Sequence, residues 1–171
     1  WAKLNNLKQA AKTMNFLTEH GISSYGELES KLTAVSARRD TAHAEIKRIE
    51  SRSAELALVM KHAGTYRQLK PLYERYRKSN DKEKFLRGHE SEIILFEAAA
   101  RELKRLGTVP LPTTESMKTE LANLTAEKER LLAEYKVART EAQEYETVKQ
   151  NVDALLAVPK EQEQQRRHEL E

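Results

Sequence analysis

The stretch LESKLTAVSARRDTAHAEIKRIESRSAELALVMKHA, residues 28–63, decides the fold of this chain. Its apolar residues return alternately after four and three positions for ten steps, with no glycine or proline among them. The eleven positions of this first seam, nine of them apolar or alanine, are Leu28, Leu32, Val35, Arg39, Ala42, Ile46, Ile49, Ser53, Leu56, Met60 and Ala63. A heptad pattern sustained over this length predicts a coiled-coil helix.

A second stretch, residues 117–156, repeats the same spacing. The positions of this second seam are Met117, Leu121, Leu124, Lys128, Leu131, Tyr135, Ala138, Ala142, Tyr145, Lys149, Val152 and Leu156. Each seam covers about two-sevenths of its helix, so a partner helix is needed to bury it. Long helices with narrow apolar stripes also suit a composition with 33% charged and only 6% aromatic residues.

We predict that the two seams face each other as a long antiparallel coiled-coil hairpin. Both helices span about 60 Å at ~1.5 Å per residue, and residues 64–112 between them are enough for a small helical cap. This pairing places Leu28 near Leu156 and Ala63 near Met117. The alternative is a parallel homodimer through either seam, because heptads alone specify the oligomeric state poorly.

Four seam positions are not apolar, and we expect them to fix the register of the pair at some cost in stability. They are Arg39, Ser53, Lys128 and Lys149.

Turn and cap signals place the remaining segments of an all-α fold. Residues 1–20 carry one apolar helical face, made of Trp1, Leu4, Leu7, Ala11, Met14 and Leu17. Gly21 is suited to end this helix, and Ser24 with Glu27 forms a capping box that begins the next one. Thr113 or Thr114 is expected to cap the last helix, and Pro159 to end it.

The middle of the chain lacks the long repeat. Gly64, Pro71 and Gly88 interrupt it, and Pro71 predicts a kink or a break near Lys70. Short helices are expected over 72–78 and 81–106, with an extended linker at 109–112. The predicted segments are therefore an N-terminal helix (1–21), a first long helix (24–70), a helical cap and linker (71–112), a second long helix (113–158) and a frayed tail (159–171).

The sequence shows no pattern that predicts catalysis, a cofactor or a metal site. The chain has no cysteine, and its five histidines form no close cluster and no His-Glu-x-x-His motif. A glycine-rich phosphate loop and a Gly-x-Ser-x-Gly motif are also missing. We therefore expect a non-catalytic region. No apolar run approaches the ~20 residues that span a membrane, so no membrane partner is expected.

One segment, residues 61–87, stands out by its charge. It has nine basic and three acidic residues, a net charge of +6 against +3 for the whole chain. Tyrosines and Phe85 are interleaved with the basic residues, and such a pattern can neutralise phosphates and stack bases. The candidate nucleic-acid-binding residues are Arg67, Lys70, Tyr73, Arg75, Tyr76, Arg77, Lys78, Lys82, Lys84 and Arg87. The alternative is that the tyrosines pack the cap and the charges only solvate it.

Two stretches resemble a known family. They are WAKLNNLKQAAKTMNFLTEHGISSYGEL (1–28) and PLYERYRKSNDKEKFLRGHESEIILFEAAARELKRLG (71–107) with the following Leu111-Pro112. They are similar to the C-terminal helical region of relaxase/mobilisation proteins of conjugative transposons and plasmids of Gram-positive bacteria. The resemblance covers most of the chain, but it rests on helical sequence and includes no catalytic motif.

The resemblance implies an accessory role in the bacterial cytoplasm. Enzymes of this family nick one DNA strand at a transfer origin, with a catalytic tyrosine and a histidine-held metal in a separate N-terminal domain. That histidine motif is absent here, so no tyrosine of this chain inherits the role. Because the chain begins at Trp1 without an initiator Met, we expect it to be part of a longer protein. The implied partners are transfer-origin DNA and relaxosome or type IV secretion coupling proteins.

A second interpretation remains open. The chain would then be a purely structural coiled-coil module for protein interaction or oligomerisation, in which the seams and exposed helix faces matter and the basic segment does not.

Overall fold

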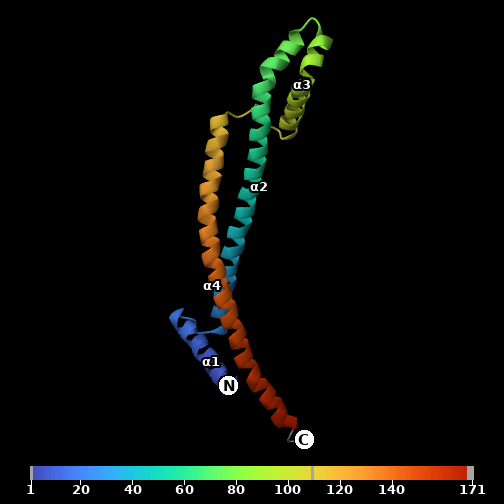
Figure 1. Cartoon of the computed structure of the whole chain (residues 1–171). Helices are drawn as coiled ribbons and strands as arrows, with labels where there is room; N and C mark the ends of the chain where they lie inside the picture. Colours follow the sequence, from blue (N-terminus) through green and yellow to red (C-terminus); the bar gives the residue numbers. More distant parts are fainter. Residues whose placement is uncertain (1, 109, 169–171) are drawn as a thin grey trace. The chain divides into compact units, whose positions relative to one another are not determined.

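The computed structural model describes residues 2–108 and 110–168, with side chains for residues 6–108 and 110–157 (Figure 1). These residues form four helices and no strand, as the predicted all-α class requires. The helices are α1 (Ala2–Glu19), α2 (Tyr25–Lys78), α3 (Lys82–Arg105) and α4 (Thr114–His168). No helix among the described residues is long and apolar enough to cross a membrane.

The chain divides into two compact units. Unit 1 consists of Trp1–Glu45 and Arg130–Glu171, and unit 2 of Ile46–Glu129. Both boundaries fall inside helices, so each unit contains one part of α2 and one part of α4. The two units are described separately below.

The core of unit 1 forms where α1, the start of α2 and α4 meet. Leu28 is only 1% exposed and packs in one cluster with Tyr145 and Val148. Half-buried side chains surround this cluster: Phe16, Leu17, Ile22, Leu32, Val35 and Val152. The predicted pairing of Leu28 with Leu156 is therefore wrong, since Leu156 is 56% exposed. The α4 residues that share the cluster with Leu28 are Tyr145, Val148 and Val152, which come earlier in the chain than Leu156.

Interhelical contacts define the direction of the long helices in unit 1. The Tyr25 hydroxyl donates to Asp153 Oδ1 at 2.6 Å, and Lys149 Nζ lies 3.7 Å from Glu29 Oε1. Arg38 pairs with Glu141 further along α2. As the α2 residue number rises from 25 to 38, the number of its α4 partner falls from 153 to 141. The two segments are therefore antiparallel within this unit.

Unit 2 has its own core, built from α2, α3 and the start of α4. The buried members of this cluster are Leu56, Val59, Ala63, Leu103 and Met117. Ala63 and Met117 thus share one core, as the sequence pattern predicted. Two ion pairs also join α2 to α4 in unit 2. Arg52 Nη2 lies 2.7 Å from Glu120 Oε1, and Lys128 Nζ lies 2.8 Å from Glu50 Oε1.

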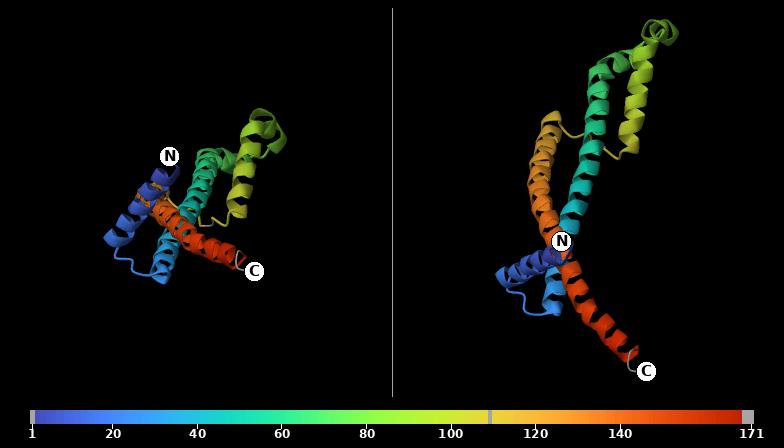
Figure 2. Two further views of the ribbon diagram at one scale, coloured as in Figure 1. Left: turned by 90° about the horizontal axis from the view of Figure 1, so that it is seen from below. Right: turned by 60° about the horizontal axis from the view of Figure 1, so that its bottom comes forward.

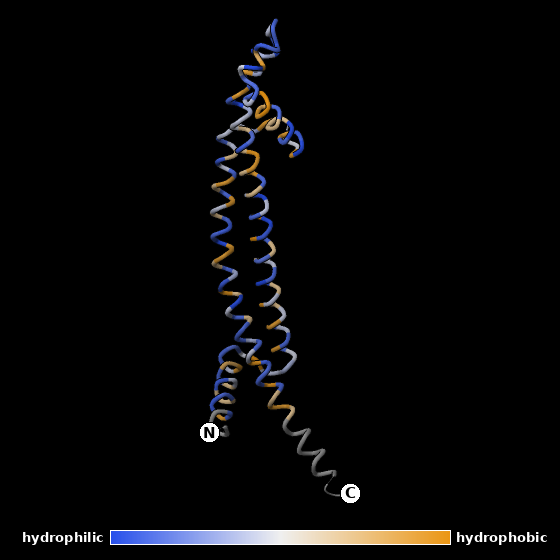
Figure 3. Tube along the Cα trace, turned by 45° about the vertical axis from the view of Figure 1, so that its right-hand side comes forward, coloured by the Kyte–Doolittle hydropathy of each residue, from blue (hydrophilic) through white to orange (hydrophobic). Residues whose placement is uncertain are grey.

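The two seams are the buried faces of the long helices. Every position of the first seam is buried or half-buried, and so is every position of the second seam except Leu156. Figure 3 shows the same pattern, with apolar residues returning at short intervals between polar ones along both long helices. Val59 and Val148 are also buried, although the strict heptad reading left them outside the seams.

The helix α1 packs with only part of the predicted face: Leu17 contacts the core of unit 1, Leu7 and Met14 do not, and the side chains of Trp1 and Leu4 lie outside the described residues. Leu7 and Met14 are 67% and 59% exposed, whereas Thr13 is only 1% exposed. Phe16 supplies the reason, because its ring meets the Tyr145 ring edge-on at 5.0 Å between centroids. A helix turned to bury Phe16 and Thr13 cannot also bury the Leu7–Met14 stripe.

Two prolines lie inside long helices, so the break considered at Pro71 and the helix end predicted at Pro159 are wrong, whereas the kink predicted as the other outcome at Pro71 is not. The helix α2 continues past Pro71 to Lys78, and Figure 1 shows it bending, unbroken, toward its C-terminal end. A proline removes one backbone hydrogen bond, which a long helix can lose where packing holds both sides. The helix α4 likewise continues past Pro159 to His168. Positions 169–171 of the predicted frayed tail lie outside the described residues.

The predicted caps are largely present. Gly21 and Gly107 take the left-handed conformation, with φ of 59° and 67°, after α1 and α3. The Glu27 N–H donates to Ser24 Oγ at 3.2 Å, but the Glu27 carboxylate accepts from the Ser23 N–H at 2.7 Å, one residue earlier than in a capping box. Thr113 caps α4 by accepting from the Ser116 N–H at 3.0 Å.

Candidate nucleic-acid interface

All ten predicted binding residues lie in unit 2, at the hairpin formed by the end of α2 and the start of α3. We call residues 67–87 the basic tip. Both views in Figure 2 show α3 folding back beside the C-terminal part of α2. The fold therefore gathers charges from two helices at one turn.

The turn itself is closed by short polar contacts. The Ser79 N–H donates to the Tyr76 carbonyl at 3.1 Å and ends α2. Asp81 then caps α3, because its Oδ1 accepts from the Lys84 N–H at 3.0 Å. These contacts reverse the chain within a few residues, so the basic residues on both sides of the turn come close together.

A row of aromatic rings joins α2 to α3 beneath the charges. Phe96 lies between Tyr66, at 4.9 Å between ring centroids, and Tyr73, at 4.2 Å. Tyr76 continues the row toward Phe85, at 6.1 Å. The two predicted stacking residues, Tyr73 and Tyr76, are thus each in contact with a ring on α3.

Tyr73 also makes a polar contact across the hairpin. Its hydroxyl donates to Glu97 Oε1 at 3.2 Å. Burial raises the pKa of Tyr73, and the negative charge of Glu97 raises it further. The Tyr73 side chain is therefore neutral and engaged within the protein at physiological pH.

Three of the candidate arginines also have partners within unit 2. Arg67 donates to Thr114 Oγ1 at 2.6 Å and to the Pro112 carbonyl, and so holds the start of α4. The Arg75 guanidinium lies 5.9 Å from the centre of the Phe85 ring. Arg87 lies 3.7 Å from Glu83, one turn away on α3.

Besides these three arginines, five cations are exposed at the basic tip and make neither a salt bridge nor a cation–π contact within the described residues. They are Lys70, Arg77, Lys78, Lys82 and Lys84. Positive charges that are concentrated and not neutralised locally attract polyanions over roughly a Debye length, about 8–10 Å.

Sequence reasoning missed two residues that shape this surface. The Phe96 ring contacts Tyr66 and Tyr73, and Glu97 accepts a hydrogen bond from Tyr73. Neither Phe96 nor Glu97 was among the predicted binding residues. The spacing of three and four residues between Ile93, Phe96, Ala99 and Leu103 is that of one packed helix face. It carried no signal for which rings would meet it, because that depends on the bend of α2 past Pro71.

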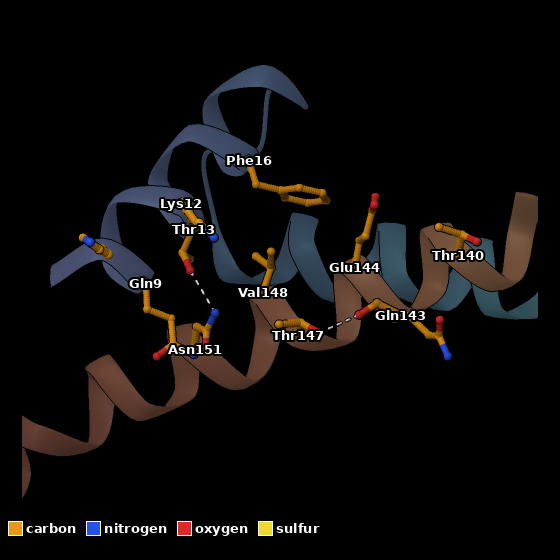
Figure 4. A pocket seen from close by; sticks show the side chains of 11 residues that line it. Gln9, Lys12, Thr13, Phe16, Thr140, Gln143, Glu144, Thr147, Val148 and Asn151 are labelled. Atoms are coloured by element: carbon orange, nitrogen blue, oxygen red, sulfur yellow. Dashed lines mark hydrogen bonds between the residues drawn. The ribbon is translucent and has the colours of Figure 1, made fainter. Parts of the chain in front are cut away.

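Unit 1 contains a groove that has no concentration of positive charge like that of the basic tip. This open groove between α1 and α4 has a volume of about 690 Å³ (Figure 4). Gln9 Nε2 donates to Asn151 Oδ1 at 2.9 Å, and Asn151 Nδ2 donates to Thr13 Oγ1 at 3.1 Å. These two hydrogen bonds join α1 to α4. Within the described residues no cluster of His, Cys, Asp and Glu could hold a metal ion.

No family model, curated protein or solved structure matches the chain.

Proposed function

We propose that this chain is a non-catalytic accessory region that binds DNA through the basic tip. The observation that carries the proposal is the set of five exposed cations that the α2–α3 hairpin brings together and that make no salt bridge or cation–π contact within the described part of the chain. Lysine and arginine that neutralise phosphates release counterions, which is the main source of sequence-independent affinity for DNA.

We further propose that the parent protein is a relaxase of a Gram-positive conjugative element. The support is the resemblance of residues 1–28 and 71–107 to the C-terminal helical region of that family. The DNA would then be the transfer origin, and the place of action the bacterial cytoplasm. Strand nicking would belong to another domain of the parent. Relaxosome or secretion coupling proteins are the proposed protein partners.

Fluorescence anisotropy with labelled transfer-origin DNA at low salt tests the DNA role. The double variant Lys78→Glu/Lys82→Glu reverses two of the exposed cations, and we expect its affinity to fall at least tenfold. The matched control Lys136→Glu/Arg139→Glu makes the same change in net charge on α4, outside the basic tip, and should bind nearly as well as the unaltered chain. Absence of binding by the unaltered chain, or equal losses in both variants, would refute the proposal.

The second candidate is a structural coiled-coil module, favoured by the burial of the seams. We propose that α2 and α4 pair with each other within one chain as an antiparallel coiled-coil hairpin, since each unit by itself packs a part of α2 against a part of α4. Seams buried within one chain are not available to a parallel homodimer. In this case coupling proteins would bind the exposed helix faces. Retention of a coupling protein by Lys78→Glu/Lys82→Glu would favour this candidate over the DNA role.

A further inference from the structure

We propose that the basic tip binds the phosphate backbone of duplex DNA and takes no base into a stacking contact. This inference rests on the proposed DNA role and narrows it to one kind of substrate. It follows from which side chains of the tip are already engaged within unit 2 and which are exposed.

The first step concerns the rings. Proteins that bind single strands offer aromatic faces on which successive bases stack. Here the Tyr73 ring lies on Phe96 at 4.2 Å, and its hydroxyl is bonded to Glu97. Tyr76 lies between Tyr73, at 5.9 Å, and Phe85. A base could reach the side of the Tyr73 ring that lies on Phe96 only after the α2–α3 packing had opened, and at Tyr76 it would compete with both neighbouring rings.

The second step concerns Phe85, the remaining ring of the tip. The Arg75 guanidinium lies over it at 5.9 Å, and the His89 ring lies 4.8 Å from it between centroids. Every aromatic ring of the basic tip therefore has a partner inside unit 2. The aromatic residues hold α2 and α3 together, and the exposed charged groups around them are accessible to a ligand.

The third step concerns the exposed cations, four of which are lysines. Lysine is a compact point charge, whereas reading a base edge favours the planar, bidentate fork of arginine or the amides of asparagine and glutamine. Among the described residues, Arg75 and Arg77 are the exposed arginines of the tip without an acidic partner, and Arg75 lies over the Phe85 ring. Such a set suits phosphate contacts and provides little means of reading sequence.

The fourth step concerns the form of the DNA. Duplex DNA carries one charge per ~1.7 Å of axis, and each phosphate contact contributes about −0.9 to the salt slope, against about −0.7 for a single strand. Without stacking, the denser charge of the duplex favours it. Five contacts set a limit of about −4.5 for the slope of log K against log salt.

The test compares four labelled DNAs of equal length in anisotropy titrations at several salt concentrations. Two are duplexes of unrelated sequence, and two are their single strands. We expect the duplexes to bind alike, within about threefold, and more tightly than either single strand. The variant Lys78→Gln/Lys82→Gln should reduce the duplex slope by about 1.8, which is two contacts at ~0.9 each.

The variants Tyr73→Leu and Tyr76→Leu test stacking directly. Each should change duplex affinity less than twofold, provided that circular dichroism shows an unchanged helix content. Tighter binding of single strands, or a tenfold loss of single-strand affinity in Tyr76→Leu, would overturn the inference and leave the DNA role standing. Binding to anionic lipid vesicles with no binding to any of the four DNAs would overturn both.

Discussion

Three charged side chains occupy seam positions, and each finds an acidic partner on the other long helix. Arg39 Nη1 lies 3.6 Å from Glu146 Oε1, and Lys149 Nζ lies 3.7 Å from Glu29 Oε1. Lys128 pairs with Glu50 in unit 2. Partly exposed ion pairs add little stability. Their value lies in register, because a shift by one turn would separate each cation from its partner.

The pH dependence of unit 1 should reveal another such contact. The Tyr25 hydroxyl and then Lys149 hold the pKa of Asp153 below its usual value. A lowered folded pKa adds stability above the unfolded pKa of about 3.9, and this stability is lost as pH falls through the folded value. Tyr25→Phe should therefore lower the melting temperature at pH 7, and the difference from the unaltered chain should shrink between about pH 4 and pH 2.

Thermal melts followed by circular dichroism at each pH provide the measurement. Tyr135→Phe is the matched control, because the Tyr135 hydroxyl makes no hydrogen bond among the described residues and its ring stacks on His43 at 5.5 Å. The effect of the control should not vary over the acidic range. A Tyr25→Phe difference as large at pH 2 as at pH 7 would show that the contact with Asp153 does not depend on its charge.

At the scale of single elements, the contrast between Leu28 and Leu156 is the clearest test of the packing. Leu28 is 1% exposed within the core of unit 1, and Leu156 is 56% exposed, although both are seam positions. Leu28→Ala should cost about 2–5 kcal/mol of unfolding free energy, because it leaves a cavity. Leu156→Ala should cost about 0.5 kcal/mol or less, as surface substitutions do.

Urea unfolding followed by circular dichroism measures both free energies. Similar losses in the two variants would mean that Leu156 is buried in solution, as the heptad pattern alone predicted. A loss below about 1 kcal/mol for Leu28→Ala would contradict the core of unit 1.

The helices differ in how far their sequence predicted their packing. A heptad pattern identifies a buried face wherever one helix packs along another, and it identified nearly every buried position of α2 and α4. The helix α1 crosses its neighbours over a short contact, so one large ring, Phe16, decided its orientation against the Leu7–Met14 stripe. Pro71 predicted a kink or a break, and local sequence could not decide between them, because the contacts that hold α2 on both sides of Pro71 come from α3.

The basic tip was predictable in composition and unpredictable in detail. Charge counting located the segment. It could not separate Arg67 and Arg87, which are engaged, from Lys78 and Lys82, which are free of acidic partners. The Arg87 contact is a local one with Glu83, one turn earlier on α3, whereas the Arg67 contact depends on where the tertiary fold places Thr114, 47 residues later in the chain.

At the scale of the whole molecule, the absence of cysteine makes the chain suited to cross-linking. In Arg52→Cys/Glu120→Cys the two thiols replace side chains paired at 2.7 Å in unit 2. In Arg38→Cys/Glu141→Cys they replace a pair in unit 1. If α2 and α4 pair within one chain, a flexible bis-maleimide should join each pair intramolecularly.

Denaturing gels separate the outcomes, since an internally linked monomer migrates differently from a covalent dimer. We expect linked monomers at micromolar protein in both double variants. The single variants Arg52→Cys and Arg38→Cys should give unlinked chains. Covalent dimers as the main product of the double variants would contradict the hairpin and support a parallel homodimer.

The contact of Tyr66 and Tyr73 with opposite sides of Phe96 has a consequence for affinity. Pro71 lies between these tyrosines in the sequence, and one ring on α3 contacts both. The exposed cations that follow Pro71 are therefore preorganised, and a ligand need not order them at the moment of binding. If the basic tip binds DNA as proposed, loss of the Phe96 ring would keep every charge of the tip and still weaken that binding, because ordering the cations would then cost conformational entropy.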